Sequence, residues 1–176
     1  MKSLISHKRN LILFAFLLCL SNFTLASGQA SPESIVYDFF KSYLKEDSSD
    51  YNRLLSQYVS DELMKSINDS KMCNYDSDDS VSAGKCSQKH DCKLSKGSYI
   101  CNWYGVWVDT DVDYFTKSQN IYPSWKSTIS TFDVFQKDNN SSVSVILGAG
   151  SEPNANFKVS LEKVDEKWKI TSVSAQ

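Results

Sequence analysis

Four cysteines gathered in one segment are the residues of this 176-residue chain whose types and spacing most plainly suggest chemistry. They are Cys73, Cys86, Cys92 and Cys101. If the chain is exported, an even number in one segment favours two disulfides. Of the three possible pairings we expect Cys86–Cys92 nested inside Cys73–Cys101, because that order closes one compact loop on another. Zinc is disfavoured, because no CxxC pair occurs and only His90 could join the thiolates.

A second candidate for chemistry is an alternating acidic triplet, Asp109-x-Asp111-x-Asp113, which resembles the opening of a calcium-binding loop. The rest of that loop pattern fails, since Tyr114 stands where glycine is needed and Asn120 where the closing glutamate belongs. We therefore predict a turn and a helix start at the triplet. No metal site and no cofactor is expected.

Catalytic motifs are scarce. His90 is the one histidine beyond the N-terminal leader described below, and it falls in a polar segment rather than beside a predicted rigid element. A Ser-His-Asp or Cys-His site needs its histidine held in a pocket, and the cysteines are expected to be oxidised. The chain has no HExxH, GxSxG, GxxxxGK or GxGxxG motif. The acidic triplet could supply paired carboxylates for glycoside hydrolysis, although its spacing alone is no argument for that reaction. We predict that the chain is not an enzyme.

Residues 1–26 predict a cleaved secretory signal peptide. The segment comprises the basic Lys2, Lys8 and Arg9, then the apolar run Leu11–Leu20, then a polar stretch of small residues. This tripartite order is typical of secretion, and ten apolar residues are too few to span a bilayer, which takes about 20. Cleavage is expected after Ala26, with Ala30 as the second choice. The expected location is the periplasm, with no stable membrane insertion after cleavage.

Charge limits the classes of partner. The chain carries 19 basic and 21 acidic residues, a net charge of −2. Loss of residues 1–26 removes three basic residues and no acidic residue, which leaves a net charge near −5. Without a basic patch, nucleic-acid binding is disfavoured. About 150 remaining residues suffice for one domain with its own core, and we assign residues 27–176 to a single domain.

Three helices are predicted in the first third of this domain. Ser31-Pro32-Glu33 combines an N-cap, a proline for the first turn and an acidic residue for the positive end of the helix dipole. Apolar residues then recur on one helical face, at Ile35, Val36, Phe39, Phe40, Tyr43 and Leu44. The same spacing predicts a second helix through Leu54, Leu55, Tyr58 and Val59, and a third that begins at Ser60-Asp61-Glu62.

Strands are predicted for the second half of the chain. Residues 68–98 are expected to be a polar loop, with its disulfide-rich part at 73–101. Residues 99–108 predict a strand with a bulge or bend at Gly105, and residues 113–120 a short helix that buries Tyr114 and Phe115. Alternating runs separated by turns then predict antiparallel strands at 125–135, 143–147, 157–161 and 168–173. The fold class is therefore α+β, with N-terminal helices packed on a curved antiparallel sheet, cystatin-like or nuclear-transport-factor-2-like. A flatter helix–sheet sandwich is the alternative.

Four segments suggest a family. VYDFFKSYL, YVSDELMKSI, DVDYFTKSQNIYPSW and WKITSV resemble the YbjP/YqhG family, small bacterial envelope proteins built on a domain of unknown function. The resemblance extends from Ser31 to Val173, apart from the cysteine segment. It implies export and an α+β fold, and it supplies no catalytic residue. By analogy of fold and compartment, the chain is also similar to immunity proteins that neutralise secreted antibacterial enzymes in the periplasm.

We therefore predict an exported, non-catalytic binding protein, with an immunity-type inhibitor of a secreted toxin as the concrete form. The contact surface is expected to be the disulfide loop and the aromatic stretch beside it: Trp103, Tyr104, Trp107, Asp109 and Asp111. Exposed aromatics beside acidic residues suit an interface hot spot that faces a basic partner. The alternative is an envelope carrier of a small ligand, with an apolar pocket lined by Tyr37, Phe40, Tyr114 and Trp125. The oligomeric state stays open.

Overall fold

The computed structural model describes residues 30–45, 50–74, 86, 90–95 and 98–176. The predicted signal peptide, residues 1–26, lies outside the described residues. Within the described ranges, no helix has both the length and the apolar character needed to cross a membrane.

The three predicted helices are present. They are α2 (Pro32–Tyr43), α3 (Tyr51–Tyr58) and α4 (Asp61–Asn74). The Ser31 hydroxyl oxygen caps α2 by accepting a hydrogen bond from the Ser34 amide at 3.1 Å, as the sequence predicted. The expectation of a loop from residue 68 was wrong, because α4 continues to Asn74 with the buried Asp69 and Ser70 on it.

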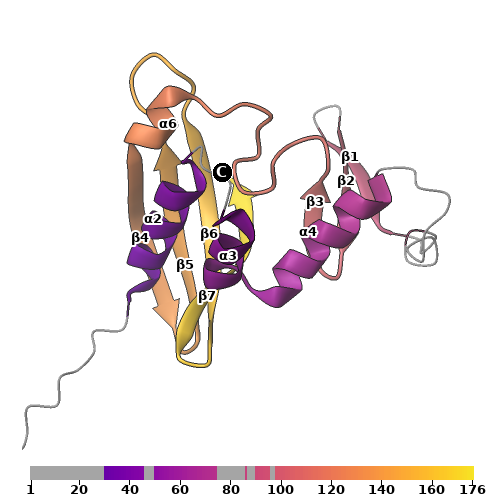
Figure 1. Cartoon of the computed structure of the whole chain (residues 1–176), viewed down its shortest axis with the longest axis horizontal. Helices are drawn as coiled ribbons and strands as arrows, with labels where there is room; N and C mark the ends of the chain where they lie inside the picture. Colours follow the sequence, from indigo (N-terminus) through magenta and orange to yellow (C-terminus); the bar gives the residue numbers. More distant parts are fainter. Residues whose placement is uncertain (1–29, 46–49, 75–85, 87–89, 96–97) are drawn as a thin grey trace, which may run out of the picture.

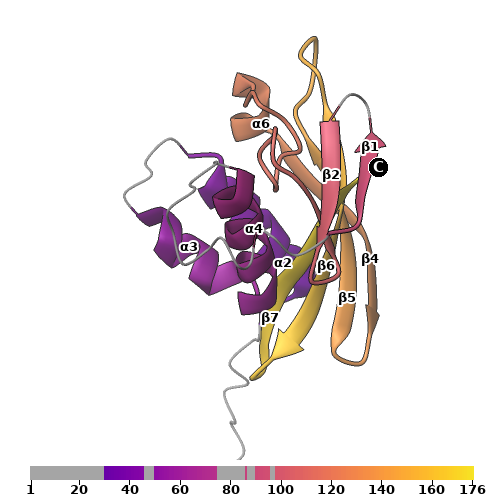
Figure 2. The same ribbon diagram turned by 90° about the vertical axis from the view of Figure 1, so that its right-hand side faces the viewer.

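A four-stranded antiparallel sheet forms the larger layer. Its strands follow the chain order: β4 (Ile129–Lys137), β5 (Asn140–Leu147), β6 (Ala155–Val164) and β7 (Lys167–Ala175). Val143, Val159 and Val173 lie opposite one another on adjacent strands and are buried. Helices α2 and α3 pack over this face (Figure 1), and Figure 2 shows α2, α3 and α4 on the same side of the sheet. The predicted α+β class, with N-terminal helices against an antiparallel sheet, is confirmed.

A second, three-stranded sheet was not predicted. It comprises β1 (Cys92–Ser95), β2 (Ser98–Trp103) and β3 (Val106–Asp109), and α4 packs against it (Figure 1). The single strand expected at 99–108 was wrong. Tyr104 and Gly105 have φ values of 54° and 90°, and positive φ at both central residues closes a two-residue hairpin that matches the twist of its strands. The bend expected at Gly105 is therefore a complete reversal of the chain.

The expected disulfide pairing was also wrong. The structure has the bonds Cys73–Cys86 and Cys92–Cys101. Strand pairing is the reason: Cys92 lies directly opposite Cys101 in the β1–β2 ladder, with a Cα–Cα distance of 4.1 Å. Each bond therefore closes its own loop, one after α4 and one across the small sheet.

Two further segments differ from expectation. Residues 113–120 form a turn and no helix, with Lys117 at a φ of 49°. Tyr114 and Phe115 are nevertheless buried, as predicted. Trp125 belongs to a short helix, α6 (Pro123–Ser127), and the strand expected from residue 125 begins at Ile129. Proline at the first turn of α6 favours that helix over an extended chain.

Candidate partner-binding groove

One face of the small sheet forms a wall of a surface groove. Opposed residues share a face of a sheet, and the register joins Lys93 to Ile100 and Ile100 to Asp109. Trp107, two residues before Asp109, lies on the same face. Facing them is the end of β7, Val173–Ala175. The resulting β7 groove has a volume of about 550 Å³ and is completed by Val112 and Lys117.

Trp107 is the large aromatic side chain of this groove, with 39% of its surface exposed. Lys93 Nζ lies 4.3 Å from the centroid of its ring, and such a cation over an indole is attracted by the negative face of the ring. A half-exposed tryptophan that a neighbouring side chain keeps in place suits a binding contact, because little conformational entropy is lost when a partner covers it.

Lys117 is the second notable residue of the groove. Its Nζ lies 3.6 Å from the centroid of the Tyr114 ring. Within the described part of the chain, no carboxylate lies within ion-pair distance of this nitrogen. Burial lowers the pKa of Lys117 to about 8, and the more distant charges of Asp113 and Asp109 oppose that shift. The groove therefore holds a partly buried ammonium group that lies over the Tyr114 ring, and none of the described carboxylates is in contact with it.

The acidic triplet organises the turn beside the groove. Asp113 Oδ1 accepts hydrogen bonds from the Phe115 and Thr116 amides at 3.0 and 2.9 Å. Asp109 Oδ1 accepts one from the Asp111 amide at 3.0 Å. The predicted turn at the triplet is present, but the helix start predicted with it is not. Its carboxylates stabilise local backbone, and Asp111 itself is exposed outside the groove.

The structure separates the residues that the sequence grouped as partner contacts. Trp107 and Asp109 line the groove. Trp103 lies on the opposite face of the small sheet, 5% exposed, with its ring stacked on His90 at 3.7 Å between centroids. Trp103 is therefore a core residue and not an exposed contact. Tyr104 is half exposed, but its hydroxyl group donates a hydrogen bond to Asp69 on α4.

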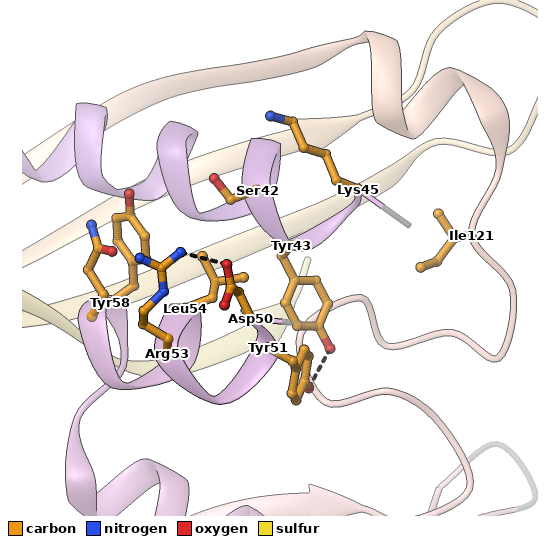
Figure 3. A pocket seen from close by; sticks show the side chains of 10 residues that line it. Ser42, Tyr43, Lys45, Asp50, Tyr51, Arg53, Leu54, Tyr58 and Ile121 are labelled. Atoms are coloured by element: carbon orange, nitrogen blue, oxygen red, sulfur yellow. Dashed lines mark hydrogen bonds and ion pairs between the residues drawn. The ribbon is translucent and has the colours of Figure 1, made fainter. Parts of the chain in front are cut away.

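A second cleft, of about 580 Å³, lies between the end of α2, α3 and Ile121 (Figure 3). The Tyr43 and Tyr51 hydroxyl oxygens are 3.2 Å apart, and Tyr43 donates a hydrogen bond to Asp113. Burial, then the charge of Asp113, raises the pKa of Tyr43. Arg53 pairs with Asp50 at 2.6 Å across the cleft rim.

Sequence reasoning assigned Tyr43 to the apolar face of α2 and missed this cluster. The signal was available in part, since a buried tyrosine hydroxyl requires a hydrogen-bond partner. Its partner lies 70 residues further along the chain, and no local pattern links the two positions.

The apolar pocket expected for a small-ligand carrier is absent from both clefts. Phe40, Tyr114 and Trp125 are buried and pack against other side chains: Phe40 stacks on Phe157, and the Trp125 indole N–H donates to the Pro153 carbonyl at 2.7 Å. Tyr37 lines neither cleft. At Phe40, Tyr114 and Trp125 the space that a carrier would need is filled by other side chains of the protein.

Comparison with known proteins identifies no family. No family model and no curated protein matches the sequence, so the resemblance to the YbjP/YqhG family is not supported. Two solved structures do match the fold, the selenomethionine and native forms of the type VI effector–immunity complex Tae3–Tai3 from Ralstonia pickettii. Their chains are 20% and 18% identical to this one, with TM-scores of 0.52 and 0.53. The alignments cover 83% and 84% of this chain and 97% of each matched chain. At this identity the likeness shows a common fold.

Proposed function

We propose that this chain is a periplasmic, non-catalytic immunity protein that binds and inhibits a secreted type VI effector. The observation that carries the proposal is the shared fold, which extends over nearly the whole of the matched chain in an effector–immunity complex. The other features of the chain favour the immunity role over the effector role.

Among the described residues, His90 and the cysteines are not arranged for nucleophilic catalysis. The His90 ring is stacked on Trp103, and its Nδ1 lies 3.2 Å from the Asn102 carbonyl oxygen, with which it can form a hydrogen bond. The four cysteines of the predicted mature chain are paired in disulfides. Nucleophilic catalysis of the Ser-His or Cys-His type requires an accessible histidine beside a free nucleophile. These residues are instead part of the small sheet and its anchorage.

The periplasm is the compartment in which such a protein would meet an incoming effector. Two observations support this location: the signal-peptide pattern of residues 1–26 and the two disulfides, which persist in oxidising compartments.

The β7 groove is the surface that we assign to the effector. It combines an exposed tryptophan, charged groups and apolar walls, which is the composition of a hot spot. The disulfide Cys92–Cys101 and the packing of α4 hold the small sheet, so the groove wall is formed before binding.

A protection assay tests the proposal. Tae3 from R. pickettii and each type VI effector of the bacterium that carries this chain are directed to the periplasm of a host, with and without the chain. We expect the chain to restore growth against one effector, and a variant without residues 1–26 to give no protection. Growth arrest by every effector in the presence of exported chain would contradict the proposal.

Trp107→Ala tests the assigned surface in the same assay. Phe135→Ala is the matched control, because Phe135 is an exposed aromatic (64%) on β4 of the other sheet. We expect Trp107→Ala to weaken protection and Phe135→Ala to preserve it. The reverse pattern would move the contact to β4.

A further inference from the structure

We propose that the β7 groove binds an acidic side chain of the effector, with the carboxylate paired to Lys117 and the adjoining residues packed on Trp107. This inference rests on the proposed function and assigns the chemistry of the partner at that surface. It differs from the sequence-based expectation of a basic partner.

Lys117 places a positive charge in the groove. Its ammonium group lies over the Tyr114 ring in a partly buried position. Removing an ammonium group from water is costly unless an opposite charge compensates. The described residues place no carboxylate in contact with Nζ, since Asp113 accepts from Tyr43 and from its own turn. Lys117 can therefore gain a stabilising ion pair when a partner brings a negative charge into the groove.

The groove as a whole carries an excess of positive charge. Its lining carries Lys93 and Lys117 against one carboxylate, Asp109. This local excess of positive charge stands out in a chain whose net charge is negative. Low-dielectric walls from Ile100, Val112 and Val173 strengthen the field inside the groove.

Basic, neutral and acidic groups of a partner would interact differently with Lys117 in the groove. A lysine or arginine of the partner would face Lys117 and add repulsion to a group that is already desolvated. A neutral segment would exclude the remaining water without compensating the desolvation cost of the Lys117 ammonium group. A carboxylate would form a charge-assisted hydrogen bond with Nζ inside the groove, and Trp107 at the rim would shield that pair from solvent.

Two substitutions of opposite sign test this inference. Lys117→Met keeps most of the aliphatic stem and removes the charge. Asp109→Asn keeps the oxygen that accepts from the Asp111 amide and removes the carboxylate charge beside Lys117. Lys137→Met is the matched control, because Lys137 is exposed on the edge strand β4, outside the groove.

The first measurement is the dissociation constant for the effector that the protection assay identifies. We expect Lys117→Met to weaken binding by about tenfold or more, Asp109→Asn to tighten it, and Lys137→Met to change it by less than about twofold. Weaker binding with Asp109→Asn and unchanged binding with Lys117→Met would overturn the inference and favour a basic contact. In that case wild-type binding would still support the proposed function.

The second measurement needs no effector. The tripeptides acetyl-Gly-Asp-Gly-amide and acetyl-Gly-Asn-Gly-amide are titrated into the wild-type chain while the Lys117 side-chain NMR signal is followed. We expect a saturable shift with the aspartate peptide alone, and no such shift in Lys117→Met. Equal responses to both peptides, or no response, would overturn the carboxylate assignment. If no effector is neutralised but this shift is seen, the proposed function fails and the acid-binding groove stands.

Discussion

The paired substitution Cys92→Ala and Cys101→Ala removes the bond that links β1 to β2, and its cost can be worked from the length of the closed loop. The two cysteines are nine residues apart, and Cys73 and Cys86 are 13 apart. The chain-entropy relation gives a loss of about 2.6 kcal/mol for the shorter loop and about 2.9 kcal/mol for the longer one. For a domain of this size, about 2.6 kcal/mol lowers the melting temperature by roughly 5–10 °C.

The assay is urea unfolding of the oxidised wild type and of the two double-alanine variants, followed by tryptophan fluorescence. Because the loops are of similar length, we expect similar losses in the free energy of unfolding. The Cys92/Cys101 variant should lose more of its effector binding, since Cys92 and Cys101 belong to strands whose other face lines the β7 groove. A loss below about 1 kcal/mol in either variant would refute the entropic reasoning.

Peptide mapping tests the pairing on which that reasoning depends. Lys85, Lys89, Lys93 and Lys96 place each of the four cysteines on a separate tryptic peptide. Mass spectrometry without reduction should find the peptide of Cys73 joined to that of Cys86, and the peptide of Cys92 joined to that of Cys101. Peptides joined as Cys86–Cys92 and Cys73–Cys101 would refute the structural account of the small sheet.

Three further predictions concern single side chains. Trp103→Ala should lower the free energy of unfolding by about 3–5 kcal/mol because Trp103 is buried. Trp107→Ala should lower it by less than about 1 kcal/mol. Equal losses in denaturant unfolding would refute the assignment of Trp103 to the core and Trp107 to the surface. Lys117→Met should stabilise the protein at pH 7 by on the order of 1–3 kcal/mol. The pKa of Lys117 is lowered from 10.5 to about 8 in the folded chain, so between these pH values the unfolded chain binds this proton and the folded chain releases it. The free energy of unfolding of the wild type should therefore rise with pH across this range. An identical pH profile for the variant would contradict that assignment. Tyr43→Phe should reduce the loss of stability above pH about 10, because the raised pKa of Tyr43 makes the folded chain hold its proton more tightly; an unchanged alkaline unfolding curve would count against the buried hydroxyl.

The helices and the large sheet could be predicted because their signals are local. The apolar period of α2 follows from a single buried face, and Phe157, Val159 and Leu161 of β6 follow from strict alternation on a half-buried strand. At the acidic triplet the predicted turn was correct, since Asp109 and Asp113 accept hydrogen bonds from neighbouring amides, and the predicted helix start was wrong.

The small sheet could not be predicted because its turn depends on distant residues. Tyr104 is an unusual residue for positive φ, and Tyr-Gly is not among the common hairpin signals. The turn is supported by the Gly105 amide, which donates to Asn102 Oδ1 at 2.9 Å, and by the Tyr104 hydroxyl on Asp69 of α4. On one continuous strand Trp103 and Trp107 would share a face, and only the hairpin turn places them on opposite faces. The sequence analysis therefore assigned both to the same contact surface. The expected disulfide pairing was wrong for the same reason, because Cys92 and Cys101 are brought together by the pairing of β1 with β2 in this unpredicted sheet.

Only some of the residues that line the groove could be predicted from the sequence. Trp107 and Asp109 were predicted as contacts from their residue types alone, and both line the groove. Lys117 was not, because its position relative to them is fixed by the meeting of the small sheet with Val173–Ala175 at the far end of the chain. Contacts of this kind arise from tertiary packing, which leaves no period in the sequence.

Titration calorimetry of the purified, oxidised chain with the effector against which it protects tests the central claim most directly. We predict a 1:1 complex with a nanomolar dissociation constant, in which the lethal activity of the effector is lost at equimolar chain. Absence of binding at micromolar concentrations, or a complex in which the effector keeps its activity, would contradict the assignment of this protein as an immunity protein.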